Sequence, residues 1–264
     1  MIDKSVPSVE AAVADIGDGA TVMIGGFGTA GMPVELVDAL IAQGARDLTI
    51  VNNNAGNADT GLAALIREKR MRKIICSFPR QTDSWHFEKA WREGELELEL
   101  VPQGTLAEKL RAGGSGIAAF WTQTGVGTFV AEGGMPLRYD GAGGIALASV
   151  AKEVREFVVR GVAREYVLED AIGTDFALVH AERGDRYGNL VFHRSARNFS
   201  PLAAMAGRVA IAQVEHLVEP GEIDPDDVHL PGVYVHRVVE VGPDVPKRIE
   251  KLRVRTPAEP NQEA

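Results

Sequence analysis

A glycine-rich segment near the amino terminus has the residue types of a ligand-binding loop. Residues 25–33 include four glycines, follow the apolar run 21–24 and precede an apolar helical pattern at 34–42. Glycine permits positive φ and lets backbone N–H groups approach a ligand, and a helix start favours anionic groups. Pro33 fits the first turn of this helix, where its missing N–H is not needed. A tight structural turn without a ligand is the alternative.

Two common phosphate-binding motifs are absent from this loop. No Lys-Ser or Lys-Thr pair follows the glycines, as it would in a Walker motif, and the dinucleotide fingerprint with its downstream acid is also missing. The glycine loop therefore predicts a ligand site without specifying the ligand.

Gln103 is the second residue with a chemical indication. It lies between Pro102 and Gly104, directly after the apolar pattern 96–101. A neutral amide N–H at a strand's carboxyl end can stabilise a developing oxyanion without an ion to be desolvated. The alternative is that Gln103 only caps a helix beginning at Thr105.

The remaining candidates for catalysis or metal binding carry weaker indications. Cys76 lies in a predicted buried strand, where a thiol is a small apolar side chain by default. No Gly-x-Ser-x-Gly motif is present, and most acids fall on exposed helix faces. The histidines lack the spacing that would place two of them on one helix face to bind a metal, so we predict no metal site. The six are His86, His180, His193, His216, His229 and His236.

The elements of the first half place these segments at one edge of a sheet. Strand patterns at 21–24, 48–51, 73–77 and 96–101 alternate with helical patterns, which predicts an α/β fold with an open, mostly parallel sheet. Alternating leucine and glutamate in the fourth strand indicates a sheet margin. Because ligands bind at the carboxyl ends of such strands, the glycine loop, residues 52–56, residues 78–81 and Gln103 should be neighbours.

The second half has a different pattern from the first, with few helical segments between its strands. This pattern predicts an added, partly antiparallel β region packed on the same core. Glycine-rich turns separate short apolar segments, among them 166–168, 176–179, 189–192, 209–214 and 233–239. We predict a single domain over 1–255, with a βαβ half at 1–112 and a β-rich half at 113–255. The tail 256–264, rich in Pro, Glu, Asn and Gln, has the composition of a disordered segment.

Composition limits the partners and the compartment. The 264 residues carry a net charge of −9, which argues against nucleic acid or an anionic membrane as partner. We expect a cytoplasmic protein, because no apolar run of bilayer length and no secretory signal pattern is present. A single cysteine excludes an internal disulfide framework.

Several motifs, in the same order along the chain, resemble those of the A (α) subunit of class I 3-oxoacid coenzyme A (CoA) transferases. The similarity extends from about residue 5 to about residue 254. The matching segments are residues 25–33, 53–56, 94–108, 112–116 and 194–199.

The resemblance implies a CoA-transferase-like fold, a reaction and a set of site residues. Such enzymes move CoA from succinyl-CoA to a 3-oxoacid through a glutamyl-CoA thioester. The nucleophilic glutamate belongs to the B (β) subunit, and this chain lacks the matching Ser-Glu-Asn-Gly stretch. The resemblance places an oxyanion-stabilising role on Gln103 and cleft positions on Asn53 and Asn54. The implied CoA-binding residues are Gly25, Gly26, Phe27, Gly28, Thr29, Ala30 and Gly31.

The resemblance also implies partners and substrates. It predicts an A2B2 heterotetramer that is inactive without its B subunit, with CoA thioesters as substrates and no tightly bound cofactor. Residues 78–81 are similar to the matching segment of enzymes that act on 3-oxoadipate. Residues 229–237 and 247–252 are more similar to the matching segments of enzymes that act on acetoacetate. We favour 3-oxoadipate and hypothesise that Arg80 pairs with its distal carboxylate. A surface or subunit-interface role for Arg80 is the alternative.

A second function class is a non-catalytic domain that senses a sugar phosphate or an acyl-CoA. Related open-sheet folds serve as effector modules, and a fold does not fix a function. A sensor normally carries an output segment, and we expect none here.

Overall fold

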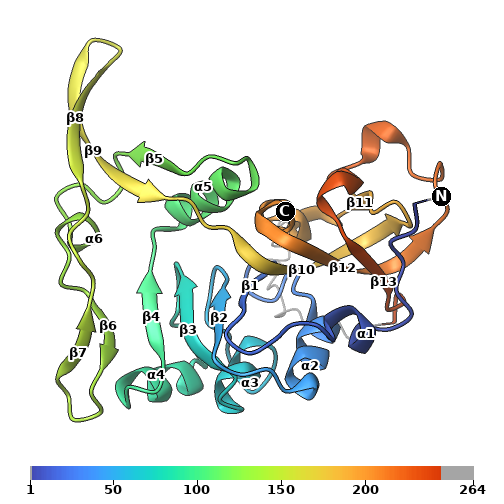
Figure 1. Ribbon diagram of the computed structural model, residues 1–264, viewed down its shortest axis with the longest axis horizontal. Helices are drawn as coiled ribbons and strands as arrows, with labels where there is room; N and C mark the ends of the chain where they lie inside the picture. Colours follow the sequence, from blue (N-terminus) through green and yellow to red (C-terminus); the bar gives the residue numbers. More distant parts are fainter. Residues whose placement is uncertain (1, 245–264) are drawn as a thin grey trace, which may run out of the picture.

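One large sheet forms the centre of the molecule (Figure 1). The computed structural model describes residues 2–244, so the predicted disordered tail 256–264 lies outside the described residues. The sheet has eight strands in the order β13-β12-β10-β1-β2-β3-β4, with β11 paired to β10. Every pairing along the main order is parallel, and only β11 runs antiparallel.

The first half follows the predicted alternation of strands and helices. Its strands are β1 (Thr21–Ile24), β2 (Leu48–Val51), β3 (Met71–Cys76) and β4 (Glu97–Leu100). Its helices are α1 (Val9–Val13), α2 (Val34–Gln43), α3 (Leu62–Arg67), α4 (Trp85–Arg92) and α5 (Gln103–Gly114). β4 ends the sheet order, which confirms the predicted margin. Pro33 is the residue before α2 rather than part of its first turn.

Three apolar segments of the predicted β region, 176–179, 209–214 and 233–239, belong to the large parallel sheet. These segments form β10 (Thr174–Asp185), β12 (Gly207–Val218) and β13 (Arg237–Glu240), which extend the parallel sheet beyond β1. β10 and β12 are mostly buried along their centres. Strands covered on both faces have continuous apolar runs, so local sequence does not distinguish them from other buried strands. The short β11 (Leu190–Val191) and α7 (Ser200–Ala206) lie between β10 and β12 in the chain.

Antiparallel strands do occur, in two smaller sheets. β5 (Ala119–Thr122), β9 (Val162–Asp170) and β8 (Val154–Val159) form one, and β6 (Pro136–Tyr139) and β7 (Ile145–Ala148) form the other. The short helix α6 (Phe129–Glu132) precedes β6. Figure 1 shows β6, β7 and β8 on the left, away from β13, and β9 running from there toward the centre; β6 packs beside β4. The Tyr139 ring of β6 packs edge-on against Trp91 of α4, with centroids 4.9 Å apart.

Helices cover both faces of the large sheet. One buried apolar cluster joins α1 to α4 with side chains of β1 to β4, and a second joins α5 and α7 with β10 and β12. These two clusters form the core and hold the strand ends in place. Every helix among residues 2–244 is too short or too polar to cross a bilayer.

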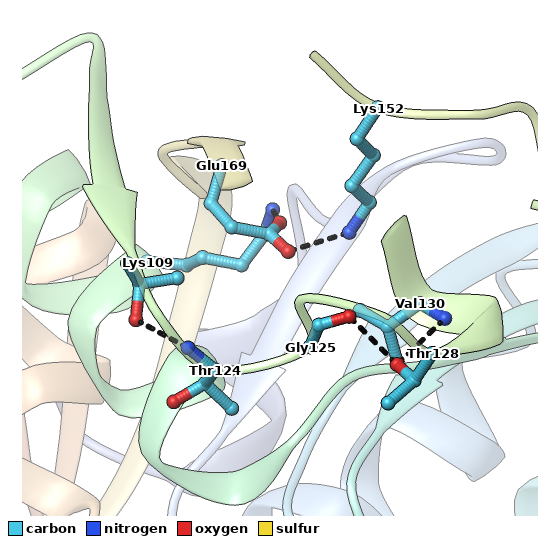
Figure 2. A network of polar contacts seen from close by, with 8 residues as sticks. Lys109, Thr124, Gly125, Thr128, Val130, Lys152 and Glu169 are labelled. Atoms are coloured by element: carbon cyan, nitrogen blue, oxygen red, sulfur yellow. Dashed lines mark hydrogen bonds and ion pairs between the residues drawn. The ribbon is translucent and has the colours of Figure 1, made fainter. Parts of the chain in front are cut away.

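A buried charge network connects α5 to the antiparallel region (Figure 2). The Glu169 carboxylate on β9 accepts hydrogen bonds from Lys109 of α5 at 2.8 Å and from Lys152 at 2.6 Å. The Glu169 side chain is 1% exposed, and that of Lys109 is 7% exposed. The network therefore fixes α5, which carries Gln103 at its first position, against β9.

Candidate active site

A cleft of about 1250 Å³ opens at the carboxyl ends of β1, β2, β3 and β4. Its lining consists of residues 27–31, Asn53, residues 77, 78 and 80–82, Gln103 and residues 193–196. The predicted meeting of the glycine loop, the asparagine segment, residues 78–81 and Gln103 is therefore confirmed.

Three of the predicted site residues lie behind the cleft wall rather than in its lining. Gly25 and Gly26 are buried, and a Cβ at Gly25 would come within 2.8 Å of the Ser200 hydroxyl. Asn54 is 1% exposed, and its side-chain oxygen accepts the Gly56 N–H at 2.7 Å. These residues shape the loops, whereas residues 27–31 and Asn53 face the cleft.

Gln103 and Asn53 are joined by a side-chain hydrogen bond in the cleft. The Gln103 amide donates to Asn53 Oδ1 at 3.0 Å, and the Ser77 hydroxyl donates to the same oxygen at 2.7 Å. Asn53 is 3% exposed. The amide of a glutamine carries two N–H donors, so the bond to Asn53 orients the group while a second donor remains.

Gln103 also begins helix α5, which corrects the alternative that it caps a helix starting at Thr105. The first helical bond runs from the Leu106 N–H to the Pro102 carbonyl, at 2.8 Å. The N–H groups of residues 103–105 therefore precede the hydrogen-bonded turns, and the positive end of the helix dipole lies beside Gln103. Both features favour negative charge near this amide.

Residues 193–196 line the cleft, and the segment 193–199 packs on the glycine loop. Asn198 Nδ2 donates to the Ala30 carbonyl at 3.0 Å. Gly31 has φ +75°, and a Cβ there would lie 2.5 Å from the Ala196 carbonyl oxygen. Residues 194–199 are one of the segments that carry the family resemblance, but the sequence analysis predicted no site role for them. That resemblance was the signal that could have indicated their place in the site.

The arginine and histidine side chains of the lining are its only titratable groups within residues 2–244, and all are basic. Arg80, His193 and Arg194 line the cleft, and no aspartate or glutamate of residues 2–244 does so. Arg80 is 64% exposed and pairs with Glu88 at 3.1 Å, while His193 Nδ1 lies 3.0 Å from Glu182. A local basic lining in an acidic chain favours an anionic ligand.

Cys76 and the histidines offer no nucleophile or metal centre in the described part of the chain. Cys76 is fully buried, and burial raises the pKa of its thiol to about 12, so the thiolate is scarce at neutral pH. Within residues 2–244, no three His, Cys, Asp or Glu side chains converge in a way that could hold a metal ion.

Comparison with known proteins identifies the family. The model of the family "Coenzyme A transferase" matches residues 6–241. The chain belongs to the coenzyme A transferase family. It is 54% identical to the A subunit of a probable succinyl-CoA:3-ketoacid coenzyme A transferase of Mycobacterium tuberculosis, over 96% of this chain and 100% of that protein.

Two further relatives of this CoA-transferase chain extend the comparison. The A subunit of a 3-oxoadipate CoA-transferase of Pseudomonas putida is 52% identical, over 91% of this chain and 95% of that protein. The apoenzyme of the acyl-CoA transferase YdiF from Escherichia coli O157:H7 has 26% identity and a TM-score of 0.72. The match covers 92% of this chain and 47% of YdiF, so the chain spans about half the length of that protein.

Proposed function

We propose that this chain is the A subunit of a CoA-transferase that moves CoA from succinyl-CoA to a 3-oxoacid. The B subunit supplies the glutamate nucleophile, and the two chains together form the site. The names of two relatives, both described as A subunits, support this assignment. In this proposal CoA thioesters are substrates and no cofactor is tightly bound.

The observation that carries the proposal is the cleft with Gln103 on one wall and no carboxylate in its described lining. A group placed there meets an amide donor held by Asn53 and the positive end of α5. Such donors lower the energy of a negatively charged oxygen. The cleft therefore suits stabilisation of an oxyanion and leaves the attacking group to another chain.

The chemistry assigns Gln103 to the acyl-transfer step. A carboxylate oxygen of the partner attacks the thioester carbonyl carbon, and the carbonyl π electrons move to its oxygen. The free N–H of the Gln103 amide donates to that oxyanion. The oxyanion re-forms the carbonyl as the C–S bond breaks and CoA leaves as a thiolate. This thiolate then attacks the acylated carboxylate, which releases succinate and leaves CoA on the enzyme for the 3-oxoacid.

The glycine loop has a binding role in the proposal. Residues 27–31 line the cleft beside Gln103 and would contact CoA through backbone groups, with Gly25 and Gly26 supporting the loop from behind. Asn53 orients Gln103, and Asn54 stabilises the loop of residues 53–56.

We favour 3-oxoadipate as the acceptor, with acetoacetate as the alternative. Residues 78–81 carry the preference for 3-oxoadipate, since Arg80 at the cleft offers a cation for a distal carboxylate. The two relatives above carry the names of both types of enzyme at similar identity. A cytoplasmic A2B2 assembly is part of the proposal.

Co-expression with the B subunit tests the proposal. The purified assembly is incubated with succinyl-CoA and either 3-oxoadipate or acetoacetate, and formation of the new thioester is followed by its absorbance. We expect transfer by the assembly and none by this chain alone. Transfer by the isolated chain, or a stable homodimer that binds acyl-CoA and never recruits a second chain, would contradict it. The latter result would favour a sensing domain.

A further inference from the structure

The three basic side chains of the cleft differ in whether a carboxylate already lies beside them. Arg80 has Glu88 as partner, and His193 has Glu182. Arg194 lines the same cleft as Gln103, and within residues 2–244 its guanidinium makes no ion pair or hydrogen bond. Arg194 is therefore the cation of the described lining that is left to meet a charge from outside the chain.

The backbone at Arg194 points to the same conclusion. Arg194 has φ +45°, in the left-handed region that residues other than glycine rarely adopt. Such conformations persist where the surroundings impose them, and they cluster at ligand clamps. Here the surroundings are the contacts of Ala196 and Asn198 with the glycine loop, which hold residues 194–198 in place.

We propose that Arg194 binds an anionic group of the substrate within the cleft. The inference rests on the proposed function and names a residue for it. A guanidinium can hold a carboxylate or a phosphate with two parallel hydrogen bonds. Two groups of the substrates have this chemistry: the distal carboxylate of a succinyl or 3-oxoadipyl group, and a phosphate of CoA.

Arg194 differs from Arg80 in what binding an anion requires. A ligand at Arg80 shares the guanidinium with Glu88 or displaces that carboxylate, which repels an incoming anion. A ligand at Arg194 meets no such competitor among the described residues. Arg194 should therefore contribute more to anion binding than Arg80.

The experiment uses the co-expressed assembly and four variants. Arg194→Gln removes the charge, Arg194→Lys keeps it without the planar fork, and Arg194→Gly removes the side chain while accepting the backbone angle. Arg197→Gln is the matched control, because Arg197 is exposed on the same short helix and lies outside the cleft lining. Melting temperatures of all variants report whether the fold is intact.

We expect Arg194→Gln to lower kcat/KM for succinyl-CoA about 10- to 100-fold, the loss typical of a hydrogen bond to a charged group. Arg194→Gly should lose as much without a fall in melting temperature. Arg194→Lys should recover part of the loss, and Arg197→Gln should leave turnover unchanged.

Two further measurements identify which anion is bound. If Arg194 holds a distal carboxylate, Arg194→Gln loses more activity with 3-oxoadipate than with acetoacetate and binds free CoA as the unchanged protein does. If it holds a phosphate, calorimetry shows weaker binding of free CoA, and both acids lose equally. The proposal for Arg194 is overturned if three quantities of Arg194→Gln all stay within twofold of the unchanged assembly: kcat/KM for succinyl-CoA, the activity with each acid and the affinity for free CoA. Failure of the unchanged assembly to transfer CoA would refute the proposed function instead, and binding of free CoA would still test Arg194.

Discussion

Gln103 is the residue on which the proposed chemistry depends most directly. Its amide is fixed by Asn53, whose oxygen is held in turn by Ser77. Because the donor is already oriented, little reorganisation is needed when negative charge develops on a substrate oxygen.

Replacing Gln103 with alanine should lower kcat of the assembly by about 10²- to 10³-fold, as loss of one oxyanion donor does. Melting temperature should change little, because the side chain is on the surface of the cleft. Steady-state assays with succinyl-CoA measure the effect, and Gln123→Ala, on an exposed turn, serves as the control. Unchanged turnover in Gln103→Ala would show that this amide has only a structural role.

Arg80 carries a separate prediction about the choice of acid. Arg80→Ala should lower kcat/KM for 3-oxoadipate more than for acetoacetate, because only the former has a distal carboxylate. The difference should be modest, about 2- to 5-fold, since Glu88 partly neutralises the guanidinium and the pair is exposed. Parallel assays with both acids measure it, and equal losses would assign Arg80 to the surface or to a subunit interface.

At the scale of elements, the contact between the glycine loop and residues 194–198 shapes the cleft. Gly31 and Gly28 both have positive φ, but only Gly31 faces a backbone atom where a Cβ would be, the Ala196 carbonyl. Comparing alanine variants at Gly28 and Gly31 therefore separates the cost of backbone strain from the cost of a steric clash.

Gly31→Ala should destabilise the protein more than Gly28→Ala. Both variants carry the strain of a left-handed alanine, about 1 kcal/mol, and Gly31→Ala adds a clash that pushes residues 194–198 away. Urea unfolding of the purified variants measures the free energies. Equal losses of unfolding free energy would mean that residues 194–198 move away from the glycine loop without an energetic cost.

The buried network around Glu169 fixes another pair of elements, α5 and β9. Two ammonium groups share one carboxylate there, and the Glu169 and Lys109 side chains are almost fully buried. Removing the carboxylate would leave positive charge in a region of low dielectric, which is costly.

Glu169→Gln should therefore lower the free energy of unfolding by about 3 kcal/mol. Glu153→Gln is the control, because Glu153 forms an exposed ion pair with Arg155 that should contribute below about 1 kcal/mol. Thermal and urea unfolding compare the two. A loss below about 1 kcal/mol in Glu169→Gln would mean that water or a new arrangement solvates both lysines.

At the scale of the whole molecule, an ion pair joins the beginning of the chain to its last described strand. Arg237 of β13 donates two hydrogen bonds of 2.6 Å to the Asp15 carboxylate, which follows α1. These bonds lower the pKa of Asp15 below its ordinary value. The pair is partly exposed, so its contribution to stability should be below about 1 kcal/mol.

The lowered pKa of Asp15 sets the direction of a pH effect. The ion pair should stabilise the fold above about pH 4, the ordinary pKa of an aspartate, and the contribution should vanish as the pH falls through the lower pKa of the folded state. Asp15→Asn should thus be less stable than the unchanged chain at pH 7, with the difference shrinking below about pH 4. Urea unfolding at several pH values measures this, and a constant difference would contradict it. Glu156→Gln, on exposed β8, controls for net charge.

Much of the fold could be predicted from the sequence because its signals are local. Apolar runs of strand length alternate with helical patterns in the first half, and parallel strands place their following loops at one edge. For this reason the glycine loop, Asn53 and Gln103 could be expected together from the strand pattern alone. Alternating leucine and glutamate likewise predicted the margin position of β4.

Only the tertiary structure decided which strands extend the sheet and which side chains meet in the cleft. β10 pairs with β1 from a position far along the chain, and β12 pairs with β10. The apolar runs of these strands carry no information about which strand each pairs with. The folded chain also brings Arg194 and Gln103, far apart in the sequence, into the lining of one cleft. Residue patterns indicate which surface a segment buries, whereas strand order is set by packing over the whole chain. That Arg194 lines the cleft without an ion pair among residues 2–244 could therefore be seen only in three dimensions.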